Sequence, residues 1–411
     1  MATPIQLRVS QPSPAGSDEP RVPAYDGPPF FSYGFRPFFL GAALFAGAAV
    51  PAWILIVTGA IGANFLYPAR EWHVHEMLFG FLPAAMAGFI LTAIPNWTGR
   101  APVRGPLLVS LWALWLAGRL VLALPGPIPV VAGVVDAAFL VSLAAVIWHE
   151  VVAARIWSRA AIGVLFTIYA AANIWFHVLG LSGTSTVVPE RVALSILLIL
   201  LTFIGGRVTP AFTAEYLAGQ ESAGHSPASF SHVDKLSMLL VFAAALIWMI
   251  QPAGLTAGAL FVAAGVANLI RVARWRGWAA WREPLVWMLS VGYGWLALSL
   301  LALGGAVFGV LPAANAVHVL TTGAVGAMTL AVMTRASLGH TGHPRHAGLM
   351  TLVLYALVNV GAVFRILAPA TDAPTGLTSL MLGMAALGWS GAYLLFAVIY
   401  GPMLVRPSLD E

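Results

Sequence analysis

The chain reads VHEMLFGFLPAAMAGFILTAI from Val74 to Ile94. After its first three residues this run carries no charged side chain, and a helix that crosses a bilayer needs roughly 20 apolar residues. Similar runs fill most of the 411 residues, of which 60% are apolar and only 9% are charged. Ordinary globular chains carry about 25% charged residues. The sequence therefore predicts an all-α polytopic membrane protein, and it excludes a soluble enzyme and a nucleic-acid-binding module.

Twelve apolar runs, separated by proline- and glycine-rich turns, are long enough to be predicted as transmembrane helices. The seventh and eighth runs are short and closely joined, which leaves eleven or ten spans as the alternative. Residues 1–30 are rich in Pro, Ser and Gly and are predicted to form a disordered cytoplasmic tail, followed by a single transmembrane domain over 31–411. The predicted spans are residues 37–59, 74–94, 106–124, 128–148, 160–180, 192–218, 236–251, 254–270, 284–308, 312–334, 347–364 and 377–402.

The distribution of basic residues predicts the orientation of the chain. With twelve spans, 15 of the 20 Lys and Arg residues fall on the side of the N-terminus. Only Arg70, Arg191 and Arg365 fall on the opposite side, and Arg119 and Arg207 lie within spans. Because cytoplasmic loops hold most Lys and Arg residues, we expect a multi-pass membrane protein with both termini in the cytoplasm. The net charge of +5 is then a consequence of topology, and no nucleic-acid partner is expected.

Four histidines are placed at similar depth in the outer third of the predicted spans: His73, His75, His177 and His318. Ionisable residues inside a membrane are usually functional, and a histidine on each of two facing helices suits axial ligation of a haem iron. His73 and His75 point about 200° apart on a helix, so only one of them can bind the same iron.

We therefore predict haem b between His318 and either His73 or His75. His177 is a candidate ligand for copper or for a second haem, since a third histidine would suit a copper or zinc site. The alternative is that these histidines only form hydrogen bonds between helices.

Two arginines are also predicted to contact the cofactor. An Arg at membrane depth needs an anion, and a haem propionate or a carboxylate such as Asp136, Glu76 or Glu215 would serve. Arg207 lies in GGRVTP, which indicates a broken helix beside a cavity, with a kinked helix and an Arg–Asp pair as the alternative. The position of Arg36, at the inner end of the first span, favours the alternative that its side chain extends to the cytoplasmic surface of the membrane.

Several stretches resemble the NnrS family of bacterial membrane proteins, and they cover nearly the whole chain. They are FRPFF (35–39), WHVHEMLFG (72–80), GFILTAIPNWTGR (88–100), GRVTPAFT (206–213) and MTLAVMTRASLGHTG (328–342). The resemblance implies a haem- and copper-containing protein of the inner membrane. It also implies a role in the response to nitric oxide and nitrosative stress, in bacteria that denitrify or meet nitric oxide.

The chain is also similar, less closely, to the catalytic subunits of haem–copper oxidases and nitric oxide reductases. These also have twelve helices, and the positions of His73 or His75 and of His318 resemble their low-spin haem ligands. This resemblance implies an oxidase-like bundle and possible nitric-oxide-reductase-like oxidoreductase chemistry. The chain departs from them because its predicted spans at 192–218 and 236–251 contain no histidine for a binuclear metal centre.

Three hypotheses follow for the function. The first is a haem protein that binds, detoxifies or reduces nitric oxide, or transfers electrons from a respiratory donor. The second is a transporter of a metal or a metal–nitrosyl species, favoured by the broken helix at Arg207. The third is an assembly factor for a respiratory complex, in which the histidines only join helices.

Overall fold

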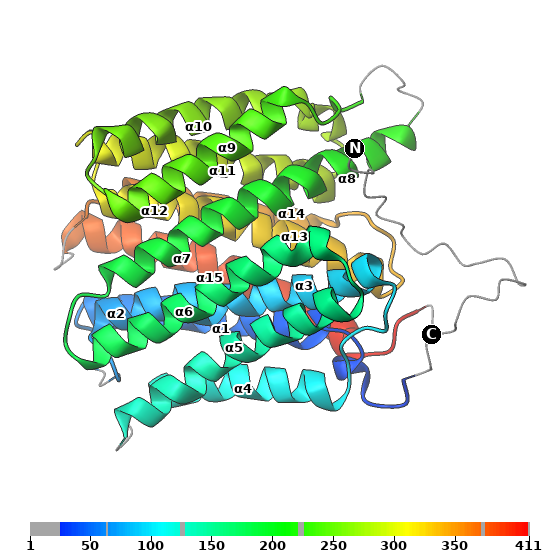
Figure 1. The fold of residues 1–411 in the computed structure, drawn as a ribbon, viewed down its shortest axis with the longest axis horizontal. Helices are drawn as coiled ribbons and strands as arrows, with labels where there is room; N and C mark the ends of the chain where they lie inside the picture. Colours follow the sequence, from blue (N-terminus) through cyan, green and yellow to red (C-terminus); the bar gives the residue numbers. More distant parts are fainter. Residues whose placement is uncertain (1–24, 63–64, 124–127, 221–225, 371–374, 410–411) are drawn as a thin grey trace, which may run out of the picture.

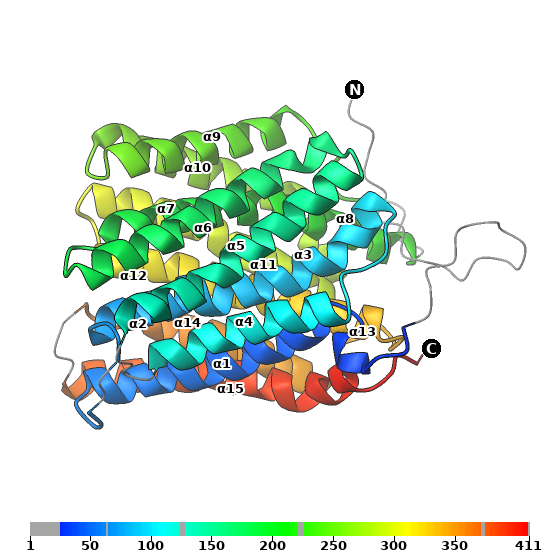
Figure 2. The same ribbon diagram turned by 60° about the horizontal axis from the view of Figure 1, so that its bottom comes forward.

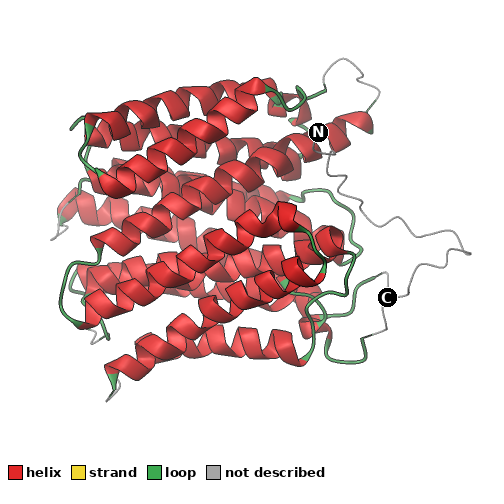
Figure 3. Cartoon of the chain, viewed as in Figure 1, coloured by secondary structure: helices red, strands yellow, loops and turns green. Residues whose placement is uncertain are grey.

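The computed structural model describes residues 25–62, 65–123, 128–220, 226–370 and 375–409. Within these ranges every regular element is helical (Figure 3). Twelve of the helical stretches are long and apolar enough to cross a membrane, which confirms the predicted fold class and the predicted number of spans. The predicted tail, residues 1–30, falls mostly outside the described residues. The likeness to an oxidase bundle stays a prediction.

The helices pack side by side in one bundle, with their axes roughly along the long axis of the molecule (Figure 1). Nine spans are formed mainly by a single α-helix: α1 (Phe35–Val57), α4 (Pro106–Ala123), α5 (Pro129–Ala153), α6 (Ala160–Leu181), α9 (His232–Ile250), α10 (Leu255–Arg274), α11 (Pro284–Val307), α14 (Leu349–Leu367) and α15 (Gly376–Val405). Large apolar side chains such as Leu239, Leu387 and Val398 are exposed on the outer faces of these helices. A lipid environment would cover them, as the composition requires.

The other three spans are each made of two α-helices joined by a π-helical segment. The segments are Glu76–Phe81 between α2 (Ala69–His75) and α3 (Leu82–Thr98), Leu201–Gly205 between α7 (Val187–Leu200) and α8 (Gly206–Ala218), and Val319–Val325 between α12 (Ala313–His318) and α13 (Gly326–His340). Such segments are rare and often mark functional sites. Two of them begin directly after a predicted ligand, His75 or His318.

The first and last helices lie side by side and close the bundle. Figure 2 shows α1 and α15 at the edge opposite to α9 and α10. Trp389 of α15 donates a hydrogen bond to the carbonyl of Ala46 in α1 at 3.2 Å. The guanidinium of Arg36 donates to the carbonyl of Leu404 at 3.1 Å, so α1 begins at the same end of the bundle at which α15 ends.

Candidate functional site

A cavity of about 980 Å³ lies at the end of the bundle away from the beginning of α1. Its volume is at the upper end of the range for small-molecule pockets, roughly 300–1,000 Å³. Most of its lining is apolar and comes from α1, α2, α7, α11, α12, α14 and α15. The polar side chains among the lining residues are Arg70, His73, Glu190, Arg191, His318, Thr321, Thr322 and Arg365.

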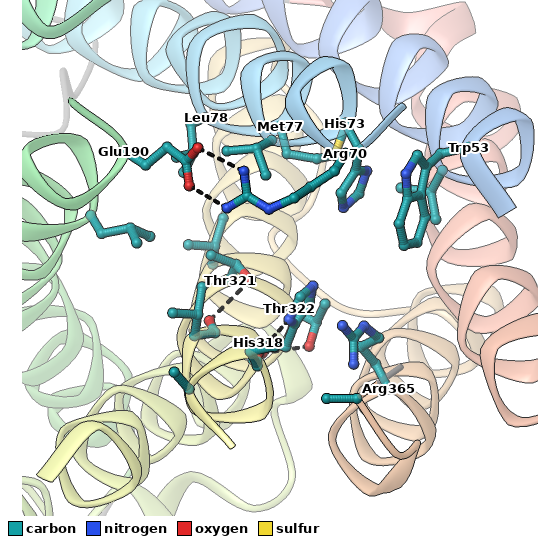
Figure 4. Close-up of a pocket in the computed structure, with 18 of the residues that line it drawn as sticks. Trp53, Arg70, His73, Met77, Leu78, Glu190, His318, Thr321, Thr322 and Arg365 are labelled. Carbon is teal, nitrogen blue, oxygen red and sulfur yellow. Dashed lines mark hydrogen bonds and ion pairs between the residues drawn. The ribbon is translucent and has the colours of Figure 1, made fainter. Parts of the chain in front are cut away.

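His73 and His318 lie on different sides of this cavity (Figure 4). The His73 ring stacks on the Trp53 indole with ring centroids 4.1 Å apart, and its Nδ1 is buried without a hydrogen-bond partner. The His318 Nδ1 lies 2.6 Å from the carbonyl oxygen of Ala314. A carbonyl can only accept, so Nδ1 carries the proton and Nε2 keeps a free lone pair. The two imidazoles thus offer nitrogen ligands to one apolar space.

The cavity lining carries more positive than negative charge. Three of its residues are arginines and one is a glutamate, which leaves an excess of two positive charges. Arg70 binds both carboxylate oxygens of Glu190, at 3.0 and 2.8 Å. The Nε of Arg365 is buried and has no hydrogen-bond partner. These groups would favour a ligand that carries two negative charges.

A second polar site is buried on another side of α2. It contains His75 of α2, Asp136 of α5 and His177 of α6, which are at most 4% exposed. Asp136 Oδ2 lies 3.2 Å from Nε2 of His75 and 2.9 Å from Nε2 of His177. One ligand atom of each residue lies within 4.8 Å of the other two, so the cluster could hold a metal ion. None of the three lines the cavity.

Neighbouring polar groups orient this cluster. Glu76 Oε1 lies 3.2 Å from His75 Nδ1, and the Tyr67 hydroxyl lies 2.6 Å from His177 Nδ1. Burial and the nearby Glu76 raise the pKa of the Tyr67 phenol, which keeps its hydroxyl protonated. Arg119 of α4 forms ion pairs with both Glu76 and Asp136. Every ring nitrogen of the two histidines therefore has a partner.

Small residues make room for these side chains. A Cβ atom at Gly80 would overlap the Arg119 guanidinium, and one at Gly133 would lie 3.3 Å from the His177 ring. Gly80 belongs to the π-helical segment Glu76–Phe81, and its carbonyl accepts a hydrogen bond from Trp115 at 2.9 Å. The local sequence after His75 thus shapes the site as well as supplying its ligand.

The structure divides the four predicted histidines between two sites. His73 and His318 share the cavity, whereas His75 and His177 share the buried cluster. The two predicted arginines lie in neither. Arg36 is buried among the carbonyls at the end of α15, and Arg207 stacks over the Phe203 ring, 4.8 Å from its centroid. Neither lines the cavity, so their predicted contact with a cofactor gains no support.

Several residues of these sites are not predicted from the sequence as site residues. Asp136 and Glu76 are expected only as partners of an intramembrane arginine, and the structure pairs both with Arg119. Arg70, Arg191 and Arg365 are expected only as exceptions to the positive-inside pattern. Their unusual location was the signal in the sequence that pointed to this site, because all three arginines line the cavity.

Comparison with known proteins adds one match. The model of the NnrS protein family matches residues 29–408. A search of curated proteins gave no match. The family match covers nearly the whole chain and includes every residue of the cavity and of the buried cluster. The chain therefore belongs to the NnrS family, which implies a multi-pass membrane protein of the nitric oxide response.

Proposed function

We propose that this protein binds haem b in the cavity between His73 and His318 and acts in the response to nitric oxide by binding this gas. One observation carries the proposal: two histidines from distant parts of the chain line one apolar cavity that has two excess positive charges. An apolar wall suits a flat macrocycle, imidazole is a common haem ligand, and arginines suit its two propionates.

The two histidines differ in how firmly they are held. His318 is oriented by its bond to the Ala314 carbonyl, whereas His73 Nδ1 has no such partner. When the ring nitrogen that does not bind the metal donates a hydrogen bond, the histidine ligand becomes more basic and its orientation is fixed. His318 would therefore be the permanent ligand and His73 the one that nitric oxide can replace. When bound, the haem would supply an iron atom with affinity for nitric oxide.

The location of the cavity fits a small apolar ligand. Its lining includes Val50, Ile54 and Val57 of α1 and Leu382 of α15, from helices at the edge of the bundle (Figure 2). Nitric oxide is apolar and dissolves in lipid, so it can approach through the bilayer. We also propose that the protein lies in the inner membrane with both termini in the cytoplasm. In that membrane a respiratory electron donor could keep the haem reduced.

The test is an optical spectrum of the purified full-length protein, oxidised, reduced, and reduced with nitric oxide, together with a pyridine haemochrome assay. We expect a b-type spectrum that shifts on addition of nitric oxide. His318→Ala should lose haem, while His149→Ala, a change at an exposed histidine remote from the cavity, should retain it.

Two results would contradict the proposal. Full haem occupancy in His318→Ala would remove the assigned ligand, and an unchanged spectrum with nitric oxide would exclude binding of the gas. A protein without haem, produced with ample haem supply, would instead favour transport of a metal or metal–nitrosyl species.

A further inference from the structure

We propose that His75, Asp136 and His177 form a non-haem iron(II) centre, separate from the haem cavity. The three residues come from α2, α5 and α6, so the site exists only in the assembled bundle. The proposal does not depend on haem in the cavity, because no ligand of one site belongs to the other.

The spacing of the three ligand atoms fits one ion. Asp136 Oδ2 is 3.2 Å from His75 Nε2 and 2.9 Å from His177 Nε2. Metal–nitrogen and metal–oxygen bonds of about 2.1 Å place neighbouring ligands about 3.0 Å apart in octahedral geometry and about 3.4 Å apart in tetrahedral geometry. All three ligand atoms lie within 4.8 Å of one another, so the side chains must move closer together to bind one ion.

The groups around His75 favour a positive charge. Its Nδ1 faces Glu76 Oε1 at 3.2 Å, and its Nε2 faces Asn173 Oδ1 at 3.0 Å as well as Asp136 Oδ2. These oxygens are all acceptors, because Asn173 uses its amide group to donate to Asp136. A neutral imidazole has only one N–H. One nitrogen of the neutral ring would therefore present a lone pair to acceptors. Either protonation of the ring or a metal ion at Nε2 relieves this, and our proposal is the metal ion.

The charges of the cluster lead to the same conclusion. Glu76 and Asp136 contribute two negative charges, and Arg119 contributes one positive charge. All three are at most 5% exposed. An uncompensated charge in a buried site is strongly destabilising. A cation between His75, Asp136 and His177 compensates the remaining negative charge where the lone pairs converge.

The surrounding residues match those of a metal site. Histidine ligands usually donate their other ring N–H to a carboxylate or another acceptor. With a metal at Nε2 of both rings, His75 Nδ1–H would donate to Glu76, and His177 Nδ1–H would donate to the Tyr67 oxygen. Asp136 Oδ1 accepts from Arg119, and Oδ2, which also accepts from the Asn173 amide at 3.0 Å, would face the ion.

Two histidines and one carboxylate hold either iron(II) or catalytic zinc, and we assign iron(II), with zinc as an outcome of the test. Two histidines and one carboxylate with open positions are typical of non-haem iron(II) sites. The chain has no cysteine to favour copper(I) or a closed zinc site. Structural zinc sites use four protein ligands, whereas this cluster supplies three. The remaining positions would be open to water or nitric oxide, and the neighbouring rings of Phe79 and Phe176 are apolar.

The two histidines of α2 allow a reciprocal experiment. The full-length protein, His73→Gln and His75→Gln are purified with ferrous iron present, and haem iron and total iron are measured separately. We expect one non-haem iron per chain. It should be lost in His75→Gln, in which the haem spectrum is unchanged. His73→Gln should keep it and alter only the haem spectrum, because His318 still binds the haem.

Asp136→Asn and His177→Gln serve as second variants, with His149→Gln as control. A single symmetric peak in size-exclusion chromatography reports folding, so the outcome does not depend on haem in the cavity. Non-haem iron that persists in all three cluster variants would overturn the assignment. Copper or zinc in place of iron, or no metal in folded protein, would also overturn it.

Nitric oxide distinguishes the two irons spectroscopically. A reduced non-haem iron–nitrosyl gives a quartet-spin electron paramagnetic resonance signal, whereas a haem–nitrosyl gives a doublet-spin signal. We expect both signals in the unaltered protein and only the doublet in His177→Gln. A quartet signal of unchanged intensity in that variant would place the non-haem iron elsewhere.

Discussion

His73 and His75 are separated by one residue, yet they belong to different sites. An α-helix turns about 100° per residue, so side chains two positions apart point in nearly opposite directions. One side chain stacks on Trp53 at the cavity, and the other contacts Glu76 and Asn173 in the buried cluster. A single helical turn thus brings two candidate metal ligands to two separate environments.

Arg365 provides a test of how a dianionic ligand is held. Its Nε is buried at the cavity without a partner, so a propionate would satisfy it. A hydrogen bond to a charged group contributes about 1.5–3 kcal/mol, and we expect Arg365→Gln to speed haem loss roughly tenfold or more. The measurement is transfer of haem to apomyoglobin, with Arg282→Gln, an exposed residue outside the cavity, as control. Equal rates in both variants would mean that Arg365 does not contact the haem.

Gly80 provides a test of packing at the buried cluster. A Cβ atom there would overlap the Arg119 guanidinium, which pairs with Glu76 and Asp136. Breaking such a buried pair costs about 3 kcal/mol, so Gly80→Ala should lower the free energy of unfolding by about this amount and lower Tm.

Gly294→Ala is the matched control, because nothing lies within 4 Å of its added Cβ. It should be neutral, or stabilising by up to about 1 kcal/mol, as expected for Ala in place of Gly in a helix. Similar Tm values for the two variants would show that the cluster accommodates the extra methyl group.

At the scale of the elements, π-helical segments set the direction of the ligands. A π-helical segment contains an extra residue relative to an α-helix and changes the angle between the helices on its two sides. Val319–Val325 begins directly after His318, and Glu76–Phe81 begins directly after His75. The π-helical segments therefore change the direction in which His318 and His75 point relative to α13 and α3. Contacts with other helices fix the positions of α13 and α3.

Deletion of Thr321 tests this role. Without one residue of the segment, a continuous α-helix would turn His318 by about 100° relative to α13. We expect the deletion variant to lose haem but to keep its non-haem iron, since the buried cluster lies on other helices. Thr321→Ala keeps the chain length and should retain haem. Normal haem content after the deletion would show that the segment does not position His318.

At the scale of the whole molecule, the basic residues are separated between the two ends of the bundle. The three arginines at the end away from the beginning of α1 all line the cavity. Lys and Arg residues are uncommon on the side of the membrane opposite to the cytoplasm. The gathering of these three arginines around the cavity therefore indicates a ligand that needs positive charge.

The absence of cysteine makes the orientation directly testable. Ser182→Cys lies between α6 and α7, and Gln220→Cys lies just after α8 at the opposite end of the bundle; both positions are exposed. With cytoplasmic termini, a membrane-impermeant thiol reagent should label Ser182→Cys in intact spheroplasts. It should label Gln220→Cys only after permeabilisation. The reverse pattern would place the termini outside the cytoplasm.

The sequence by itself determined the fold class and the twelve spans, because apolar composition and run length are local properties that dictate membrane insertion. It also identified His73, His75, His177 and His318 from their depth alone. Their division into two pairs was decided only by the tertiary structure. Depth follows from position along a helix, but the partner of a side chain depends on which helices are neighbours and on π-helical turns. Asp136 thus meets His75 and His177 through the packing of α2, α5 and α6, which no local pattern encodes.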